Sequence, residues 1–106
     1  MNQKTYEQIT QDQAKEIMDT EVGYTILDVR TEEEYDTGHI KTAICIPNET
    51  ISENISSILP DKDQLILIYC RSGSRSKQAA QKLVNLGYTN IKEFGGIITW
   101  EYEIEK

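Results

Sequence analysis

The sequence has few cysteines, one histidine and no long apolar run, and each shortage argues against a class of protein. Cys45 and Cys70 form no CxxC pair and no Cys/His cluster, so no metal site is expected. No segment reaches the roughly 18 to 20 apolar residues of a membrane-spanning helix. The start, MNQKTYEQIT, lacks the basic and apolar regions of a signal peptide. We therefore expect a cytoplasmic protein with reduced thiols and no membrane partner.

Basic residues are scarce as well, with 11 Lys and Arg against 18 Asp and Glu and a formal net charge of −7. This balance argues against a nucleic-acid partner or an anionic membrane surface. The charges are unevenly spread, because acidic residues dominate residues 1–36 whereas residues 64–92 contain neither Asp nor Glu. The basic residues in that second range are Arg71, Arg75, Lys77, Lys82 and Lys92. A local cationic region is therefore predicted around Cys70.

The length and composition, 106 residues at 38% hydrophobic, predict one domain over residues 1–106 with a single core. Apolar runs alternate with amphipathic ones, which predicts an α/β fold with a mainly parallel sheet. Strands are expected over residues 6–9, 24–29, 43–46, 65–69 and 90–94. Helices are expected over residues 10–18, 31–38, 51–60 and 76–86, with a further short helix after the turn at residues 95–96.

Local signals support these boundaries. The pairs Thr10 with Gln13 and Thr31 with Glu34 have the spacing of a capping box at a helix start. Gly87 is expected to end the helix over residues 76–86. The apolar residues Ile51, Ile55, Ile58 and Leu59 would lie on one face of a helix that Pro60 ends.

The segment CRSGSR, residues 70–75, connects the expected central strand to the helix that follows it. In open α/β sheets, ligands bind outside the carboxyl ends of the strands. The small residues of this loop, Ser72, Gly73, Ser74 and Ser76, allow successive backbone N–H groups to form an anion-binding nest at a helix start. Cys70 would lie at the base of the nest, where the positive surroundings lower the pKa of its thiol.

The two arginines of this loop, Arg71 and Arg75, can donate paired hydrogen bonds to an oxyanion. The loop therefore predicts a site where a Cys70 nucleophile meets a small anion. The alternative is a surface turn with solvated arginines and an inert cysteine. His39 is expected to bind loop backbone as a structural residue, which leaves a Cys/His protease arrangement without support. Cys45, in the apolar run AICIP, is expected to be a small buried hydrophobic residue.

Three segments within residues 26–100 together resemble a known family: LDVRTEEEYDTGHI, AICIP and YCRSGSRSKQAAQKLVNLGYTNIKEFGGIITW. In order and spacing they are similar to a single-domain rhodanese, a thiosulfate sulfurtransferase-like protein. The resemblance implies a three-layer α/β/α domain with a five-stranded parallel sheet. It also implies that Cys70 takes sulfane sulfur from a small anionic donor as a persulfide. The acceptor would be cyanide or a thiol, on a small molecule or a protein, with no metal or organic cofactor.

The resemblance also assigns roles by position. The loop from Arg71 to Arg75 matches the residues whose amides cradle the persulfide. Asp28 and Arg30 match a DVR motif with a structural role near the active loop. The closing GGxxxW motif, a turn and a core anchor, corresponds to Gly95, Gly96 and Trp100. Thr42 departs from the family, which often has glycine there, so a different turn into AICIP is expected.

Two other functions stay open. A cysteine phosphatase or arsenate reductase surrounds a tetrahedral oxyanion with a Cys-x5-Arg loop. Here Cys70 and Arg75 form a Cys-x4-Arg loop, and the shorter ring favours a single sulfur over three phosphate oxygens. The second alternative is a non-catalytic protein-binding module of the same fold. Such modules commonly lack the cysteine that this chain has.

Overall fold

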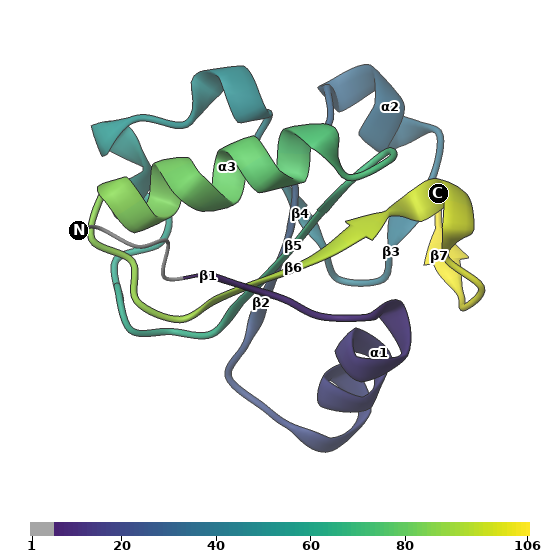
Figure 1. Cartoon of the computed structure of the whole chain (residues 1–106). Helices are drawn as coiled ribbons and strands as arrows, with labels where there is room; N and C mark the ends of the chain where they lie inside the picture. The colour runs from purple at the N-terminus through teal and green to yellow at the C-terminus, as the bar shows by residue number, and fades with distance from the viewer. Residues whose placement is uncertain (1–5) are drawn as a thin grey trace.

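A computed structural model describes residues 6–106 and contains a sheet of five parallel strands between two helical layers (Figure 1). The strand order is β1-β6-β5-β2-β4. The strands are β1 (Tyr6–Gln8), β2 (Thr25–Asp28), β4 (Ile44–Cys45), β5 (Ile66–Cys70) and β6 (Ile91–Gly96). Helix α3 (Ser74–Asn85) covers one face and α1 (Gln11–Thr20) covers the other. The predicted α/β/α architecture with a five-stranded parallel sheet is confirmed.

Strand β5 is the centre of the sheet, and all five of its residues are buried. Because side chains alternate along a strand, Ile68 and Cys70 join the core cluster under α3. Leu67 and Tyr69 join the second cluster, which packs against α1. The side chain of Cys70 therefore points toward the α3 layer.

The predicted helix starts are largely correct. Both capping boxes are present, Thr10 with Gln13 for α1 and Thr31 with Glu34 for α2 (Glu32–Asp36). Helix α3 begins at Ser74, two residues earlier than expected, so Arg75 belongs to its first turn. It is the longest helix at 12 residues, and none within the described chain is long and apolar enough to cross a bilayer.

The prediction of a helix over residues 51–60 is wrong. This part of the chain forms two short 3₁₀ helices, η1 (Asn48–Thr50) and η2 (Glu53–Ser57). Ile58, expected on the buried face, is 55% exposed. The hydroxyl groups of Ser56 and Ser57 donate to backbone carbonyls three residues earlier. Such local hydrogen bonds compete with a regular helix, which explains why the isoleucine spacing misled.

The C-terminal segment also differs from the prediction of a closing helix. One 3₁₀ turn, η3 (Ile97–Thr99), is followed by strand β7 (Ile104–Glu105). Strand β7 pairs in antiparallel fashion with β3 (His39–Ile40), which the sequence pattern did not indicate. Residues 101–105 alternate Glu with Tyr or Ile, a period of two that suits a strand better than a helix.

The turn into β4 contains an unusual backbone conformation. Thr42 has φ of 69°, in the left-handed region that favours glycine. The turn therefore has the backbone that a glycine would adopt, although a threonine occupies it. Thr42 therefore carries backbone strain in this turn.

Candidate active site

The loop after β5 closes over the sulfur of Cys70. The backbone N–H of Gly73 donates to Cys70 Sγ at 3.0 Å, and the Ser76 hydroxyl lies 3.5 Å from it. Gly73 has φ of 113°, which turns its N–H inward and places it as the N-cap of α3. Cys70 is only 1% exposed, so its sulfur lies at the base of the loop. The predicted nest at a helix start is therefore present.

These contacts set the ionisation of the thiol. Burial alone raises the pKa of Cys70, but hydrogen bonds from the Ser76 hydroxyl and from the backbone N–H groups of Ser76, Gly73 and Ser72 lower it. The net change in pKa is downward from the ordinary thiol value. The partial positive charge at the start of α3 acts in the same direction. The thiolate, which is the nucleophilic form, is therefore favoured.

The Gly95–Gly96 turn at the end of β6 supports this loop from below. A Cβ at Gly96 would lie 2.0 Å from the Arg71 carbonyl oxygen, so a side chain cannot fit there. The N–H of Ile98 donates to the same carbonyl at 3.2 Å. The backbone of the active-site loop therefore packs directly against the backbone at the end of β6, which fixes the position of the loop relative to Cys70.

Arg75 is bound by a carboxylate, although none is near it in the sequence. Its Nη1 lies 2.7 Å from Glu34 Oε1, and its Nη2 lies 3.0 Å from Glu34 Oε2. The hydrogen bond from Arg75 is the main cause that lowers the pKa of Glu34 to about 2. The expectation that Arg75 offers a free fork to an oxyanion needs correction, because α2 already occupies both terminal nitrogens. Arg75 still contributes positive charge near Cys70.

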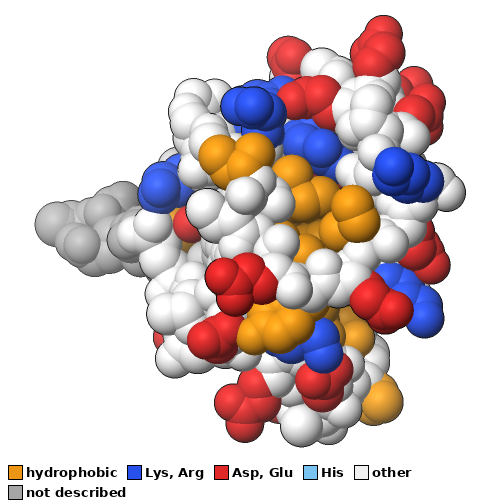
Figure 2. All heavy atoms as spheres, turned by 90° about the vertical axis from the view of Figure 1, so that its right-hand side faces the viewer, with side chains coloured by type: hydrophobic (Ala, Val, Ile, Leu, Met, Phe, Trp, Pro, Cys, Tyr) orange, Lys and Arg blue, Asp and Glu red, His pale blue; other side chains and the backbone are white. Residues whose placement is uncertain are grey.

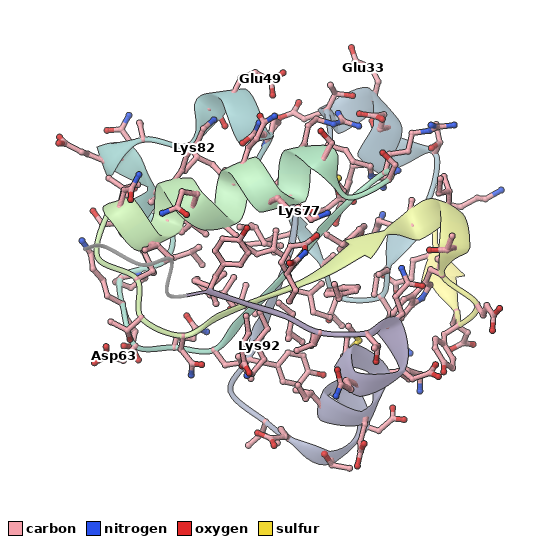
Figure 3. All side chains as sticks on the ribbon, in the orientation of Figure 1. Glu33, Glu49, Asp63, Lys77, Lys82 and Lys92 are labelled. Carbon is pink, nitrogen blue, oxygen red and sulfur yellow. The ribbon has the colours of Figure 1, made fainter. Side chains whose placement is uncertain are left out.

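Arg71 and Lys77 are the cationic side chains near the loop that have no acidic partner among residues 6–106. Arg71 is exposed directly after Cys70. The ammonium of Lys77, labelled in Figure 3, lies 3.6 Å from the position that a Cβ of Gly73 would take. Figure 2 views this end of the molecule, where basic and acidic side chains surround a group of hydrophobic ones. An anion approaching the loop would meet these two free cations first.

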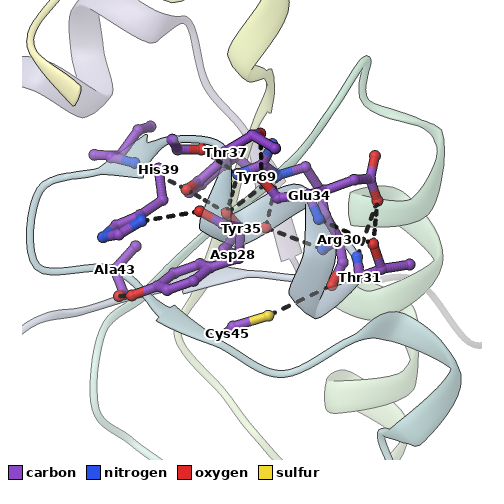
Figure 4. Close-up of polar contacts among 12 residues, drawn as sticks. Asp28, Arg30, Thr31, Glu34, Tyr35, Thr37, His39, Ala43, Cys45 and Tyr69 are labelled. Atoms are coloured by element: carbon purple, nitrogen blue, oxygen red, sulfur yellow. Dashed lines mark hydrogen bonds and ion pairs between the residues drawn. The ribbon is translucent and has the colours of Figure 1, made fainter. Parts of the chain in front are cut away.

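Asp28 and Arg30 form a buried ion pair at the end of β2 (Figure 4). Arg30 Nη2 donates to Asp28 Oδ2 at 2.7 Å and to the Gly38 carbonyl, also at 2.7 Å. The Tyr69 hydroxyl donates to Asp28 at 2.6 Å and accepts the N–H of Ile40 at 3.0 Å. These contacts connect β2 and β5 to the chain after α2, which fits the predicted supporting role of the pair.

Cys45 lies on the opposite face of the sheet from Cys70. Its register partner is Asp28, which is also the partner of Tyr69, and Tyr69 packs on the α1 side. Cys45 is half-buried and not fully buried as expected, and its thiol donates to the Arg30 carbonyl at 3.5 Å. Burial, followed by the negative charge of Asp28, raises its pKa to about 11. Cys45 therefore stays a thiol at neutral pH.

His39 has a structural environment, although its ring is half-buried, not buried, and contacts the backbone of α2 in place of the expected loop backbone. Its ring stacks on Tyr35 with centroids 3.8 Å apart, and its Nδ1 donates to the Tyr35 carbonyl at 3.2 Å. Its Nε2 lies 3.5 Å from a carboxylate oxygen of Glu105 in β7. Within residues 6–106, no three His, Cys, Asp or Glu side chains gather to hold a metal ion.

The sequence reasoning missed Glu93, a residue of β6 that is 2% exposed. Its Oε2 accepts the Ser76 hydroxyl at 2.5 Å, and Ser76 is fully buried against Cys70. A signal was available, because strand alternation places Glu93 on the same face as the core residue Ile91. An acidic residue at such an inward position needs an explanation.

Comparisons with known proteins agree with this geometry. A rhodanese-like domain model matches residues 10–103. The chain is similar to thiosulfate sulfurtransferase PspE of Escherichia coli, with 38% identity over 67% of this chain and 68% of that protein. It is also similar to a sulfurtransferase of Allochromatium vinosum, with 39% identity over 82% of this chain and 79% of that one.

A solved structure matches as well. The solution NMR structure of the rhodanese-like domain from the Anabaena protein Alr3790 has a TM-score of 0.84 and 30% identity. The match covers 92% of this chain and 77% of that one. The chain belongs to the rhodanese-like domain family.

Proposed function

We propose that the protein is a sulfurtransferase that moves sulfane sulfur through a persulfide on Cys70. The observation that carries the proposal is the position of Cys70 Sγ at the start of α3, with the Gly73 N–H 3.0 Å away and Ser76 in contact. A lowered thiol pKa in a nest of N–H groups suits a sulfur that must be anionic both as thiolate and as persulfide. The similarity to named sulfurtransferases supports the same conclusion.

The reaction is a double displacement. The Cys70 thiolate attacks the outer sulfur of thiosulfate, the sulfur–sulfur bond of the donor breaks, and sulfite leaves with the bonding electron pair. The outer sulfur remains on Cys70 as a persulfide. A thiolate or cyanide then attacks this sulfur, and Cys70 leaves as thiolate. Electrons and atoms balance over the two steps without an external oxidant, metal or organic cofactor.

The loop residues have separate roles in this proposal. The N–H groups of Ser72, Gly73 and Ser76 stabilise the charge on sulfur. Arg71 and Lys77 attract the anionic donor, while Arg75 adds positive charge and fixes the first turn of α3 through Glu34. Ser74 begins that turn. The donor is thiosulfate or a persulfide, and the acceptor is a thiol, on a small molecule or a protein, or cyanide.

The test is to incubate the purified protein with thiosulfate and map the added sulfur by peptide mass spectrometry. We expect one extra sulfur on Cys70, which cyanide removes as thiocyanate. Cys45→Ser is the matched control and should behave as the wild type, whereas Cys70→Ser should take up no sulfur. Sulfur on Cys45, or turnover by Cys70→Ser, would refute the proposal. No sulfur at all would favour a binding module.

A further inference from the structure

Glu93 is a buried carboxylate that the sulfur-transfer steps above do not use. It is 2% exposed, and it lies in the parallel strand next to β5. Its partners are the Ser76 hydroxyl at 2.5 Å, the Gly95 N–H at 3.0 Å and the Gln8 amide at 3.4 Å. None of these is a cation. A carboxylate is costly to bury without a positive partner, so a specific role is indicated.

Ser76 connects this carboxylate to the nucleophile. Cys70 Sγ is 3.5 Å from Ser76 Oγ, and Ser76 Oγ is 2.5 Å from Glu93 Oε2. The carbonyls of Gly73 and Gly95 also lie near this hydroxyl, at 3.0 and 3.4 Å. While Cys70 is a protonated thiol, the carboxylate is the nearest acceptor and the only charged one of the three, so the Ser76 hydroxyl donates to Glu93. The Ser76 oxygen then faces the Cys70 thiol with a free lone pair.

The three side chains of this hydrogen-bonded path are shielded from water. Cys70, Ser76 and Glu93 are all between 0% and 2% exposed. A proton that leaves the Cys70 thiol therefore needs an acceptor within the protein, and His39, the histidine of the chain, is held by Tyr35 away from the loop. Glu93 is such an acceptor, because two hydrogen bonds connect it to Cys70 through Ser76.

We propose that Glu93 takes the Cys70 thiol proton through the Ser76 hydroxyl, so that Cys70 meets its substrate as the thiolate. The S–H bond of Cys70 breaks and its proton passes to Ser76 Oγ, while the Ser76 hydroxyl proton passes to Glu93 Oε2. The Ser76 hydroxyl, re-formed with the Cys70 proton, then donates to the Cys70 thiolate. No electron leaves the protein, and the proton count is unchanged. The inference rests on the proposed function for its biological meaning, but the proton path can be tested without sulfur transfer.

The charged and titratable groups around this path are few. Strand β1 presents Tyr6 and the neutral Gln8 on this face, and α1 presents the neutral Gln11 to Gly95. The charged side chains at or near the loop include Arg71, Lys77 and Arg75 with its partner Glu34, and the carboxylate of Glu49 also acts on Arg75. These cations favour the thiolate in every variant compared below. A change that depends on Glu93 can therefore be separated from their effect.

The test compares wild type and Glu93→Gln, both in a Cys45→Ser background, by the rate at which the neutral reagent iodoacetamide alkylates Cys70. Near pH 6 most thiols are protonated, so loss of the base should slow alkylation by about tenfold or more. Near pH 9 the thiolate forms without help, and the two rates should agree within about threefold. Loss of a negative charge acting only through space predicts the opposite, a faster reaction near pH 6.

Ser76→Ala breaks the path and should show the same loss near pH 6. Glu7→Gln removes an exposed carboxylate of β1, paired with Lys92, and should change neither rate. If Glu93→Gln does not fold, the solvent isotope effect on wild-type alkylation still decides. We expect an isotope effect near pH 6 that disappears near pH 9. Unchanged or faster alkylation of Glu93→Gln near pH 6, or equal isotope effects, would overturn the proposal. Absence of sulfur transfer alone would contradict the proposed function but would not overturn the proton path.

Discussion

The guanidinium of Arg75 and the carboxylate of Glu34 form a two-pronged ion pair between α3 and α2, with N–O distances of 2.7 and 3.0 Å. The same carboxylate accepts the N–H of Thr31 at 2.9 Å as part of the α2 capping box. One side chain therefore caps a short helix and fixes the first turn of the helix that carries the active-site loop. Unfolding of α2 by heat or acid should therefore also disorder the active-site loop, because this ion pair connects the two.

Glu34→Gln should lower the free energy of unfolding at pH 7 by about 1 to 2 kcal/mol, a value reduced for solvent screening. The pKa of Glu34 is lowered from 4.5 to about 2, so its stabilisation is complete above the unfolded value and is lost as pH falls toward 2. The stability difference between wild type and variant should therefore be constant from neutral pH down to about pH 5 and shrink below it. Urea unfolding over a pH series measures it.

Glu33→Gln is the control, because Glu33 is exposed and points away from the molecule on the same helix (Figure 3). It removes the same charge from α2, and its effect on stability should stay within about 0.5 kcal/mol. A difference for Glu34→Gln that does not change between pH 5 and pH 2 would mean that the ion pair does not form in solution.

Arg71 and Arg75 should differ in their response to salt. Arg75→Ala should lower kcat/KM for thiosulfate by about 10- to 100-fold, since a positive charge near the sulfur and the contact that fixes the first turn of α3 are both lost. That loss should persist in high salt, because the group is ordered by Glu34. Arg71→Ala should mainly raise KM, and added salt should remove the difference, because Arg71 is exposed. If Arg75→Ala unfolds by circular dichroism, Arg75 is structural.

The fold was predictable where local pattern and tertiary role coincide. Residues 65–69 are apolar on both faces, and the resulting strand β5 is buried on both faces. The capping boxes of α1 and α2 are decided by residues three positions apart. The two 3₁₀ helices were not predictable in this way, because the apolar spacing of residues 51–59 satisfies a helix while the serines between them favour local turns.

The site was only half predictable for a similar reason. The nest around Cys70 forms from consecutive residues, so its composition reveals it. The partners of its outer members are distant: Glu34 is 41 residues from Arg75, and Glu93 is 17 residues from Ser76. Only the parallel order of β2, β5 and β6 brings them together. From the sequence alone, Arg75 therefore has no visible acidic partner.

Thr42→Gly should stabilise the protein by about 0.5 to 1 kcal/mol. Thr42 is exposed with φ of 69°, and a β-branched residue in the left-handed region costs roughly 1 to 2 kcal/mol that glycine avoids. The greater freedom of glycine in the unfolded chain removes part of the gain. Thermal unfolding measures the change. Thr42→Ala, which lacks the β-branch but keeps a Cβ, should recover less, and a destabilised Thr42→Gly would show that the turn is not strained.

Gly96→Ala should damage the active-site loop more than the fold. Its Cβ would collide with the Arg71 carbonyl at 2.0 Å and with Ser72 Cα at 2.5 Å, so the loop must move. We expect a loss of about 1 to 3 kcal/mol in stability, typical of overpacking, and loss of most sulfur transfer. Gly95→Ala is the comparison, because its Cβ meets nothing closer than 3.5 Å and its cost comes from φ of 94°. Sulfur transfer by Gly96→Ala at the wild-type rate would contradict the close approach.

Ring size should decide which anion the loop can process. A phosphate or arsenate needs loop amides on three equatorial oxygens while the sulfur attacks from below. Here four residues separate Cys70 from Arg75, the Gly73 N–H already lies 3.0 Å from the sulfur, and Glu34 holds Arg75. We therefore expect the ring to accommodate the outer sulfur of a persulfide but not to place its amides on three equatorial oxygens of a phosphate. Wild type should therefore transfer sulfur and show negligible hydrolysis of p-nitrophenyl phosphate.

One residue inserted between Gly73 and Arg75 should reduce sulfur transfer, since the N–H groups move away from the sulfur. Wild-type phosphatase turnover that Cys70→Ser abolishes would show that the loop opens wider than its hydrogen bonds indicate.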